Sequence, residues 1–151
     1  MNLTEAELTL FRAQNIAIVF QQYHLISHLT AVENVMLALE ILRIEDPQSK
    51  AEAALKELGL GHRLNHFPSQ MSGGECQRVA IARALVVRPK ILLADEPSGN
   101  LDTHTGEKVM DVFFEVVKKH NITTILVTHS ETLAKRCQRS LRLIEGHLRE
   151  V

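Results

Sequence analysis

Three short apolar runs, each followed directly by polar residues, constrain the fold of this chain more than any other feature. They are Ile16–Phe20, Ile91–Ala94 and Thr123–Val127, and their β-branched residues are typical of buried strands. Segments with helical patterns separate the three runs along the chain. Strands that are apolar on both faces and alternate with helices predict an α/β fold with a parallel sheet.

Capping and helix-breaking residues mark the segments between and after these strands. We expect helices over residues 4–12, 31–42, 48–58 and 103–120, a helix from Ser72 that stops before Pro89, a helix that starts at Ser130, and a hairpin over 140–151. The chain is predicted to be one domain, residues 1–151, with a helical subdomain of about 23–88 and a core of 13–22 and 89–151.

The bulk properties of the chain exclude several classes of protein. A formal net charge of −1 gives no basic surface for nucleic acid, so we expect no nucleic-acid partner. No stretch of the sequence approaches the roughly twenty apolar residues that a membrane helix requires. The first residues lack the basic region of a signal peptide. Any work at a membrane is therefore expected to pass through a partner protein.

Two adjacent acids, Asp95 and Glu96, directly follow the second apolar run. The carboxyl ends of parallel strands are where α/β sheets place ligands. One carboxylate there suits a magnesium ion, and the next can polarise an attacking water, which is what phosphoryl transfer requires. The plain alternative is that Asp95 caps a turn ahead of Pro97.

Three further segments carry candidate site residues. Ser72–Glu75 has the spacing of a capping box, and its two glycines would bare backbone N–H groups at a helix start, which is an anion-binding arrangement. His129 follows the third apolar run and could donate to a phosphate oxygen. Gln21 follows the first run and could meet a metal ion. Alone, each is also compatible with an ordinary role as a capped helix, a surface histidine or a polar loop residue.

Together these segments form an ordered set that is highly specific. Gln21, Ser72-Gly73-Gly74-Glu75, Asp95-Glu96 and His129 resemble the Q-loop, signature, Walker B and H-loop of ABC transporter ATPases, and Ser98–Asp102 resembles the D-loop. Glu75 stands where glutamine is commoner in that family. The segments similar to the lipoprotein-release and macrolide-export subfamily are Leu3–Phe11, Phe20–Gln22, Leu29–Val35 and Gly73–Glu75.

The resemblance implies a P-loop NTPase-like fold, ATP hydrolysis, and a role for each residue. Glu96 would be the general base or water-orienting acid, and His129 would contact the γ-phosphate and the reacting water. Asp95 would support Mg²⁺, joined by Gln21 at the metal or the attacking water. The segment Ser72–Glu75 would act in trans on the ATP held by a second ATPase subunit.

The resemblance also implies partners and a location. Asp102 would link the two nucleotide sites across the dimer. Transmembrane permease subunits would dock on the helical subdomain, and the protein would lie in the cytoplasm at the inner face of the cell membrane. ATP hydrolysis would then energise the export or extraction of a lipophilic substrate of the lipoprotein or macrolide type.

A phosphate loop of the pattern G-x-x-x-x-G-K-[ST] does not occur in the sequence, because no lysine follows a glycine anywhere. We therefore expect an N-terminally truncated ABC ATPase fold, in which the strand at 123–127 is unpaired on one side. Such a chain alone is predicted to be aggregation-prone and to bind MgATP poorly. Tight binding in isothermal titration calorimetry would contradict this expectation.

Two other functions stay open at this point. A non-catalytic fragment or interaction module, from a misassigned start codon, a pseudogene or a split gene, would lack ATPase activity beside an active longer form. It could still lend its signature helix to an intact partner. An ABC ATPase of DNA maintenance would carry a long coiled-coil insertion, and the short helical segment after Gln21 favours transport instead.

Overall fold

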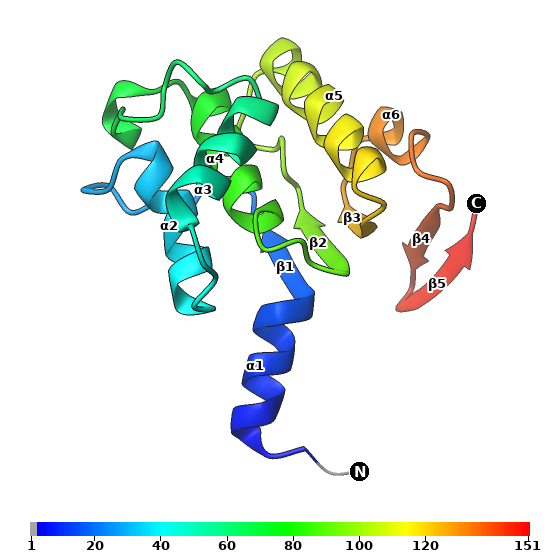
Figure 1. Ribbon diagram of the computed structural model, residues 1–151. Coiled ribbons are helices and arrows are strands. Elements are labelled where there is room, and N and C mark those ends of the chain that lie inside the picture. The colour runs from blue at the N-terminus through cyan, green and yellow to red at the C-terminus, as the bar shows by residue number, and fades with distance from the viewer. Residues whose placement is uncertain (1–2) are drawn as a thin grey trace.

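The computed structural model describes residues 3–151 as a small parallel sheet covered on one face by helices (Figure 1). The strands β1 (Ile16–Val19), β2 (Ile91–Asp95) and β3 (Thr123–Val127) lie in the order β1-β2-β3, and β4 (Leu141–Ile144) and β5 (His147–Glu150) form an antiparallel hairpin. The helices are α1 (Glu5–Asn15), α2 (Ala31–Ile41), α3 (Pro47–Glu57), the 3-10 turn η1 (Pro68–Gln70), α4 (Gly73–Leu85), α5 (Thr103–Lys119) and α6 (Glu131–Ala134). The predicted α/β class, the parallel sheet and the C-terminal hairpin are confirmed.

The helix starts follow from capping residues. Ser72 accepts a hydrogen bond from the backbone N–H of Glu75 and donates its own N–H to the Glu75 carboxylate, which confirms the predicted capping box. Helix α3 begins one residue earlier than predicted, because Pro47 occupies the first turn, where a missing N–H costs nothing, and Asp46 caps it. Helix α1 runs on to Asn15, beyond its predicted end.

Helix α4 is the centre of the core. It contacts α2, α3, α5 and β1, and its Val79 has no exposed surface. Phe113 of α5 is also fully buried. The sheet face beneath these helices carries Val19, Leu92 and Ala94, none of which is more than 1% exposed. This packing aligns the three strands so that their carboxyl ends open on one edge of the sheet.

The end of α3 is joined to the end of α5 by charged side chains. The Glu57 carboxylate lies 2.6 Å from Lys119 Nζ and 3.0 Å from His120 Nε2. The predicted boundary between a helical subdomain of about 23–88 and a core of 13–22 and 89–151 runs through this contact. That division stays a prediction.

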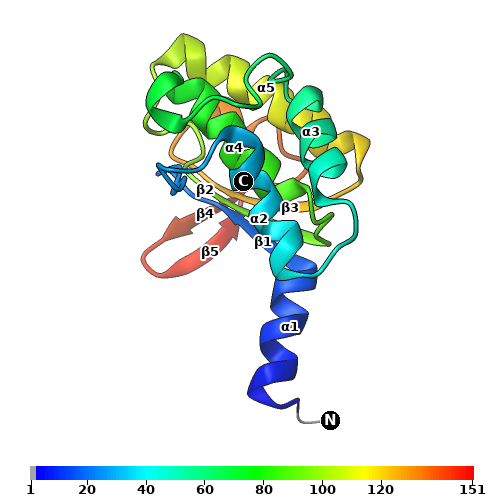
Figure 2. The same cartoon turned by 60° about the vertical axis from the view of Figure 1, so that its left-hand side comes forward.

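The outer face of the sheet is bare within residues 3–151. Ile18 is 45% exposed, Ile125 55% and Val127 57%, and the register of the sheet places Ile18 and Ile125 on either side of Leu93. The expectation that the strands are buried on both faces is therefore wrong for this face, because α4 and α5 cover only the other one. The predicted free edge of β3 is confirmed, since β3 pairs with β2 alone in the described part. Helix α1 points away from the body and buries no side chain (Figures 1 and 2).

Replacing Ile125 and Val127 by threonine should raise the soluble fraction of the 151-residue chain, because it removes apolar surface from this face while keeping β-branched residues. Each large apolar side chain left in water forfeits about 1.5–3 kcal/mol of burial free energy. Light scattering against protein concentration measures the effect. The matched control is Thr123→Val, which adds apolar surface to the same face and should lower solubility. Equal solubility of all three proteins would contradict this interpretation.

Candidate functional site

The predicted acid and histidine meet at the carboxyl ends of β2 and β3. The Glu96 Oε1 atom lies 2.7 Å from His129 Nδ1 and accepts the His129 backbone N–H at 2.9 Å. Glu96 in turn donates its own N–H to Val127 O, which extends the pairing of the two strands by one residue. The carboxylate and the imidazole, 33 positions apart in sequence, thus share one edge of the sheet.

Glu96 has a left-handed backbone, with φ of 45°. A non-glycine residue in this region costs free energy and persists where the surrounding structure requires it. Pro97 follows Glu96 and is buried, and Gly99 donates to Glu96 O at 2.9 Å, so a tight turn holds the strained residue. The turn directs the Glu96 side chain toward β3. This side chain is 21% exposed, while the His129 side chain is 82% exposed.

Gln21 is bound to the segment after Glu96. Its Nε2 donates to Asn100 Oδ1 at 3.2 Å, and Asn100 Nδ2 donates back to Gln21 O at 3.0 Å. A Cβ placed on Gly99 would lie 2.7 Å from Gln21 Nε2, so only glycine lets the glutamine approach this closely. Gln21 therefore lies at the same edge as Glu96, as predicted, and is held there by two reciprocal amide hydrogen bonds.

The segment Ser72–Glu75 lies against the start of α5. A Cβ on Gly74 would lie 2.5 Å from Thr105 Cγ2, and a Cβ on Gly73 would lie 2.8 Å from Tyr23 Oη. A side chain at either position would force a neighbouring side chain to move, so both glycines permit close packing, in addition to any role in exposing backbone N–H groups. Gly73 is exposed and Gly74 is buried, so the glycine pair spans the boundary between the surface and the core.

Asp95 and Asp102 occupy different environments. Asp95 ends β2 and is exposed at the carboxyl edge of the sheet. Asp102 caps α5 and accepts the Thr105 N–H at 3.0 Å. Hydrogen bonding by the Thr105 hydroxyl, and secondly by its backbone N–H, lowers the pKa of the Asp102 carboxyl. Its predicted role between two subunits stays a prediction.

The family model of the ABC transporter matches residues 2–99 of the chain. The chain belongs to the ABC transporter family. It is 49% identical over 152 residues to the ABC transporter ATP-binding protein YbbA of Escherichia coli K12, an alignment that covers 99% of this chain and 66% of YbbA. It is 48% identical to the lipoprotein-releasing system ATP-binding protein LolD of Geobacter metallireducens, covering 97% of this chain and 66% of LolD.

A solved ABC cassette has the same fold. The dimeric ATP-binding cassette MJ0796, in a post-hydrolysis state bound to ADP and Pi, superposes with a TM-score of 0.83 at 41% identity. The superposition covers 99% of this chain and 68% of that one. The predicted family and the ABC ATPase fold are thereby confirmed, and the chain spans about two-thirds of the length of these proteins.

Several residues that hold the candidate segments in place were not predicted from the sequence. Arg83 of α4 donates to Tyr23 O at 3.0 Å and to His24 O at 2.7 Å, just after Gln21. Gln77 of the same helix is fully buried and donates to Phe20 O at 3.3 Å. The only sequence signal for this bond is that Gln77 is a polar residue on the otherwise apolar face of α4.

The side-chain oxygens at the carboxyl edge of the sheet suit a magnesium ion that phosphate oxygens also coordinate. Asp95 offers an exposed carboxylate, and the Oε1 of Gln21 makes no hydrogen bond within residues 3–151. Mg²⁺ prefers one or two carboxylates with water and phosphate oxygens as its remaining ligands. A closed protein cage for a metal would require a group of three or more His, Cys, Asp or Glu side chains, and none gathers in the described residues.

Within residues 3–151, none of the helices has the length and apolar character that crossing a membrane requires.

Proposed function

We propose that this chain is the ATP-hydrolysing subunit of an ABC transporter. The observation that carries the proposal is the contact of Glu96 with His129 at the carboxyl edge of a parallel sheet, beside Gln21 and its partner Asn100. Phosphoryl transfer requires mainly that groups be positioned and that charge be stabilised. A carboxylate, an imidazole and an amide fixed at one edge by hydrogen bonds of 2.7 to 3.2 Å meet that requirement.

Each of these side chains has a proposed part in the reaction. Glu96 orients the attacking water and accepts its proton, and the bond to His129 keeps the carboxylate in place. The exposed imidazole of His129 can reach a terminal phosphate oxygen. Asp95 and Gln21 would hold Mg²⁺, which neutralises charge on the phosphates when bound. Ser72–Glu75 would contact ATP on a second subunit through the start of α4.

The proposed assembly is a dimer of ATPase subunits with membrane permeases. The dimeric state of MJ0796 supports the first part, and the place of the exposed Gly73 beside Leu101, a D-loop residue, supports a contact surface that joins the signature segment to Asp102. The similarity to LolD supports a lipophilic cargo of the lipoprotein type. A macrolide is the second type of cargo that we propose. The protein would lie in the cytoplasm, at the inner face of the cell membrane.

Reconstitution tests this function. The protein is purified together with permease subunits of the lipoprotein-release type. Phosphate release is measured with and without ATP and Mg²⁺, both in detergent and in lipid nanodiscs. Hydrolysis that requires Mg²⁺ and rises with the permease is the expected result. A chain that is inactive in every mixture, beside an active longer form, would favour the alternative of a non-catalytic module that lends its signature helix to an intact subunit.

A further inference from the structure

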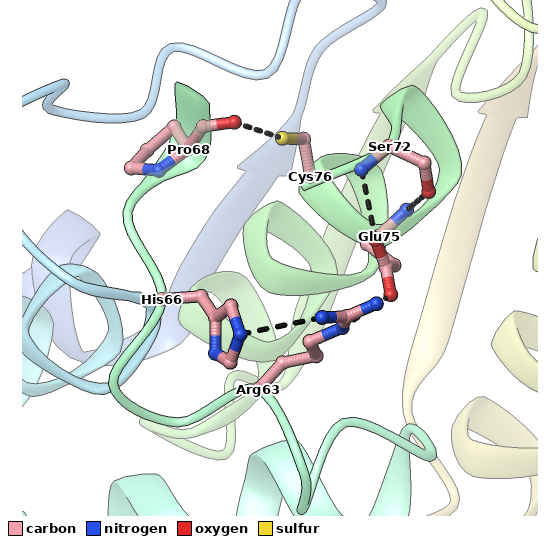
Figure 3. A network of polar contacts seen from close by, with 6 residues as sticks. All are labelled: Arg63, His66, Pro68, Ser72, Glu75 and Cys76. Atoms are coloured by element: carbon pink, nitrogen blue, oxygen red, sulfur yellow. Dashed lines mark hydrogen bonds and ion pairs between the residues drawn. The ribbon is translucent and has the colours of Figure 1, made fainter. Parts of the chain in front are cut away.

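Arg63 is joined to the first residue of the signature segment through one carboxylate. Its Nε donates to Glu75 Oε1 at 2.8 Å, and the other oxygen of Glu75 accepts the Ser72 N–H at 2.8 Å. Figure 3 shows the arginine reaching from the loop before η1 to the start of α4, with His66 beside its guanidinium, at 3.3 Å from Nη1 to Nε2. Both Glu75 oxygens are therefore engaged, one by the helix start and one by Arg63.

The loop that carries Arg63 is itself fixed to the start of α2. The backbone N–H of Ala31 donates to His66 O at 2.8 Å, and the N–H of Val32 donates to Leu64 O at 3.0 Å. Two residues that follow Arg63 in this loop, Leu64 and His66, thus accept backbone hydrogen bonds from the start of a capped helix. Because its base is anchored, the Arg63 side chain can hold Glu75 instead of following it.

The contact between Arg63 and Glu75 also places a positive charge beside a negative one. The Glu75 side chain is 13% exposed and sits in the turn whose backbone N–H groups would meet a nucleotide phosphate. Burial raises the pKa of Glu75, but hydrogen bonds from Ser72 and from Arg63 outweigh it, so that the pKa lies below its ordinary value. The carboxylate is therefore ionised at neutral pH, and without a cation beside it a negative charge would oppose the phosphates.

We propose that Arg63 is a positioning residue of the signature turn, which fixes the Glu75 carboxylate on the Ser72 N–H and offsets its charge where a nucleotide of the opposing subunit binds. The nucleotide part of this inference rests on the proposed function. The geometric part does not, because it concerns only the contacts of Arg63, Glu75 and Ser72.

The first test needs no nucleotide. The side-chain carboxyl of Glu75 is titrated by NMR in the full chain and in Arg63→Met, with Arg139→Met as the matched control, because Arg139 forms a comparable ion pair with Glu150 at 2.9 Å far from α4. We expect the pKa of Glu75 to rise and the Ser72 amide hydrogen to exchange faster in Arg63→Met, and neither to change in Arg139→Met. An unchanged Glu75 titration would overturn the proposal. If Arg63→Met does not fold, Arg63→Gln is titrated by the same criterion.

The second test uses ATP hydrolysis by the transporter. Arg63→Met is expected to raise KM for ATP about tenfold, as the loss of one charge-assisted hydrogen bond predicts, with a smaller change in kcat, and Arg63→Lys should recover part of it. In a Glu75→Gln background the same arginine substitution should change KM less than about twofold, since no charge remains to be offset. Equal losses in both backgrounds would show that Arg63 acts through packing and would overturn the proposal.

The two tests separate failure of this inference from failure of the proposed function. Absence of ATP hydrolysis in every variant, including the unsubstituted protein, counts against the function and leaves the Glu75 titration to decide the role of Arg63. Normal hydrolysis with an unchanged Glu75 titration counts against Arg63 alone.

Discussion

Glu96→Gln is expected to reduce ATP hydrolysis about 10²- to 10⁴-fold, which is the usual contribution of a general base. Glutamine keeps the size of the side chain, and its Oε1 can still accept the His129 backbone N–H that Glu96 accepts at 2.9 Å. It cannot take up the proton of the attacking water. Nucleotide affinity should change little, because the substitution removes an interaction made mainly in the transition state. Phosphate release and the binding of a fluorescent ATP analogue measure the two quantities separately.

The matched control for this substitution is Glu107→Gln. Glu107 lies on the exposed face of α5 and makes no side-chain hydrogen bond or ion pair within residues 3–151, and the same loss of one negative charge there should leave the rate within about twofold. If Glu96→Gln keeps a rate within about threefold of the unsubstituted protein while its fold is intact, Glu96 is not the base. The roles proposed for its neighbours at the edge would then need to be reassigned.

Gly74→Ala is expected to lower the free energy of unfolding by about 1–3 kcal/mol, the usual cost of overpacking. The added Cβ would lie 2.5 Å from Thr105 Cγ2 and 3.5 Å from Val109 Cγ2, so α4 and α5 must move apart or Thr105 must turn. This cost opposes the gain of up to about 1 kcal/mol that alanine brings over glycine inside a helix. Urea denaturation measures the difference, provided that the m-value is unchanged.

A second substitution tests whether the Thr105 methyl group is the cause. Thr105→Ser removes that methyl and keeps the backbone N–H that Asp102 accepts. In the serine background Gly74→Ala should cost little, and the difference between the two backgrounds is the coupling energy of the pair. If the cost of Gly74→Ala is the same with threonine and with serine, the overlap at Thr105 is relieved elsewhere and the explanation is wrong. ATP hydrolysis should follow stability in this series, because the displaced residues include the proposed signature segment.

The elements of the fold were predictable where a local rule decides them. The strand Ile91–Asp95 is apolar without interruption up to Ala94, and Ser72 with Glu75 has a capping-box spacing that acts within four residues. Which residues would meet at the edge of the sheet could also be predicted, because the carboxyl ends of parallel strands lie together. Gln21, Glu96 and His129 each follow such a strand.

What the sequence could not predict depends on contacts between distant residues. The apolar pattern of β3 is the same whether one face or both are covered, so the exposure of Ile125 had no signal in its own segment. The partner of Gln21 is 79 residues away, and nothing in the sequence of the D-loop-like segment around Asn100 indicates a hydrogen bond to Gln21. Arg63 likewise has no pattern that connects it to Glu75, because the bend of the intervening loop brings them together.

The paired amides of Gln21 and Asn100 make two segments of the chain a single mechanical unit. A motion that draws the loop at Asn100 aside must either break both hydrogen bonds or carry Gln21 with it. Thermodynamic linkage makes this influence mutual: whatever favours one position of Gln21 favours the matching position of the loop by the same free energy. A change at the proposed subunit boundary would thus alter the position of Gln21, the proposed metal ligand, and metal binding at Gln21 would alter the loop at that boundary, without rearrangement of the helices between them.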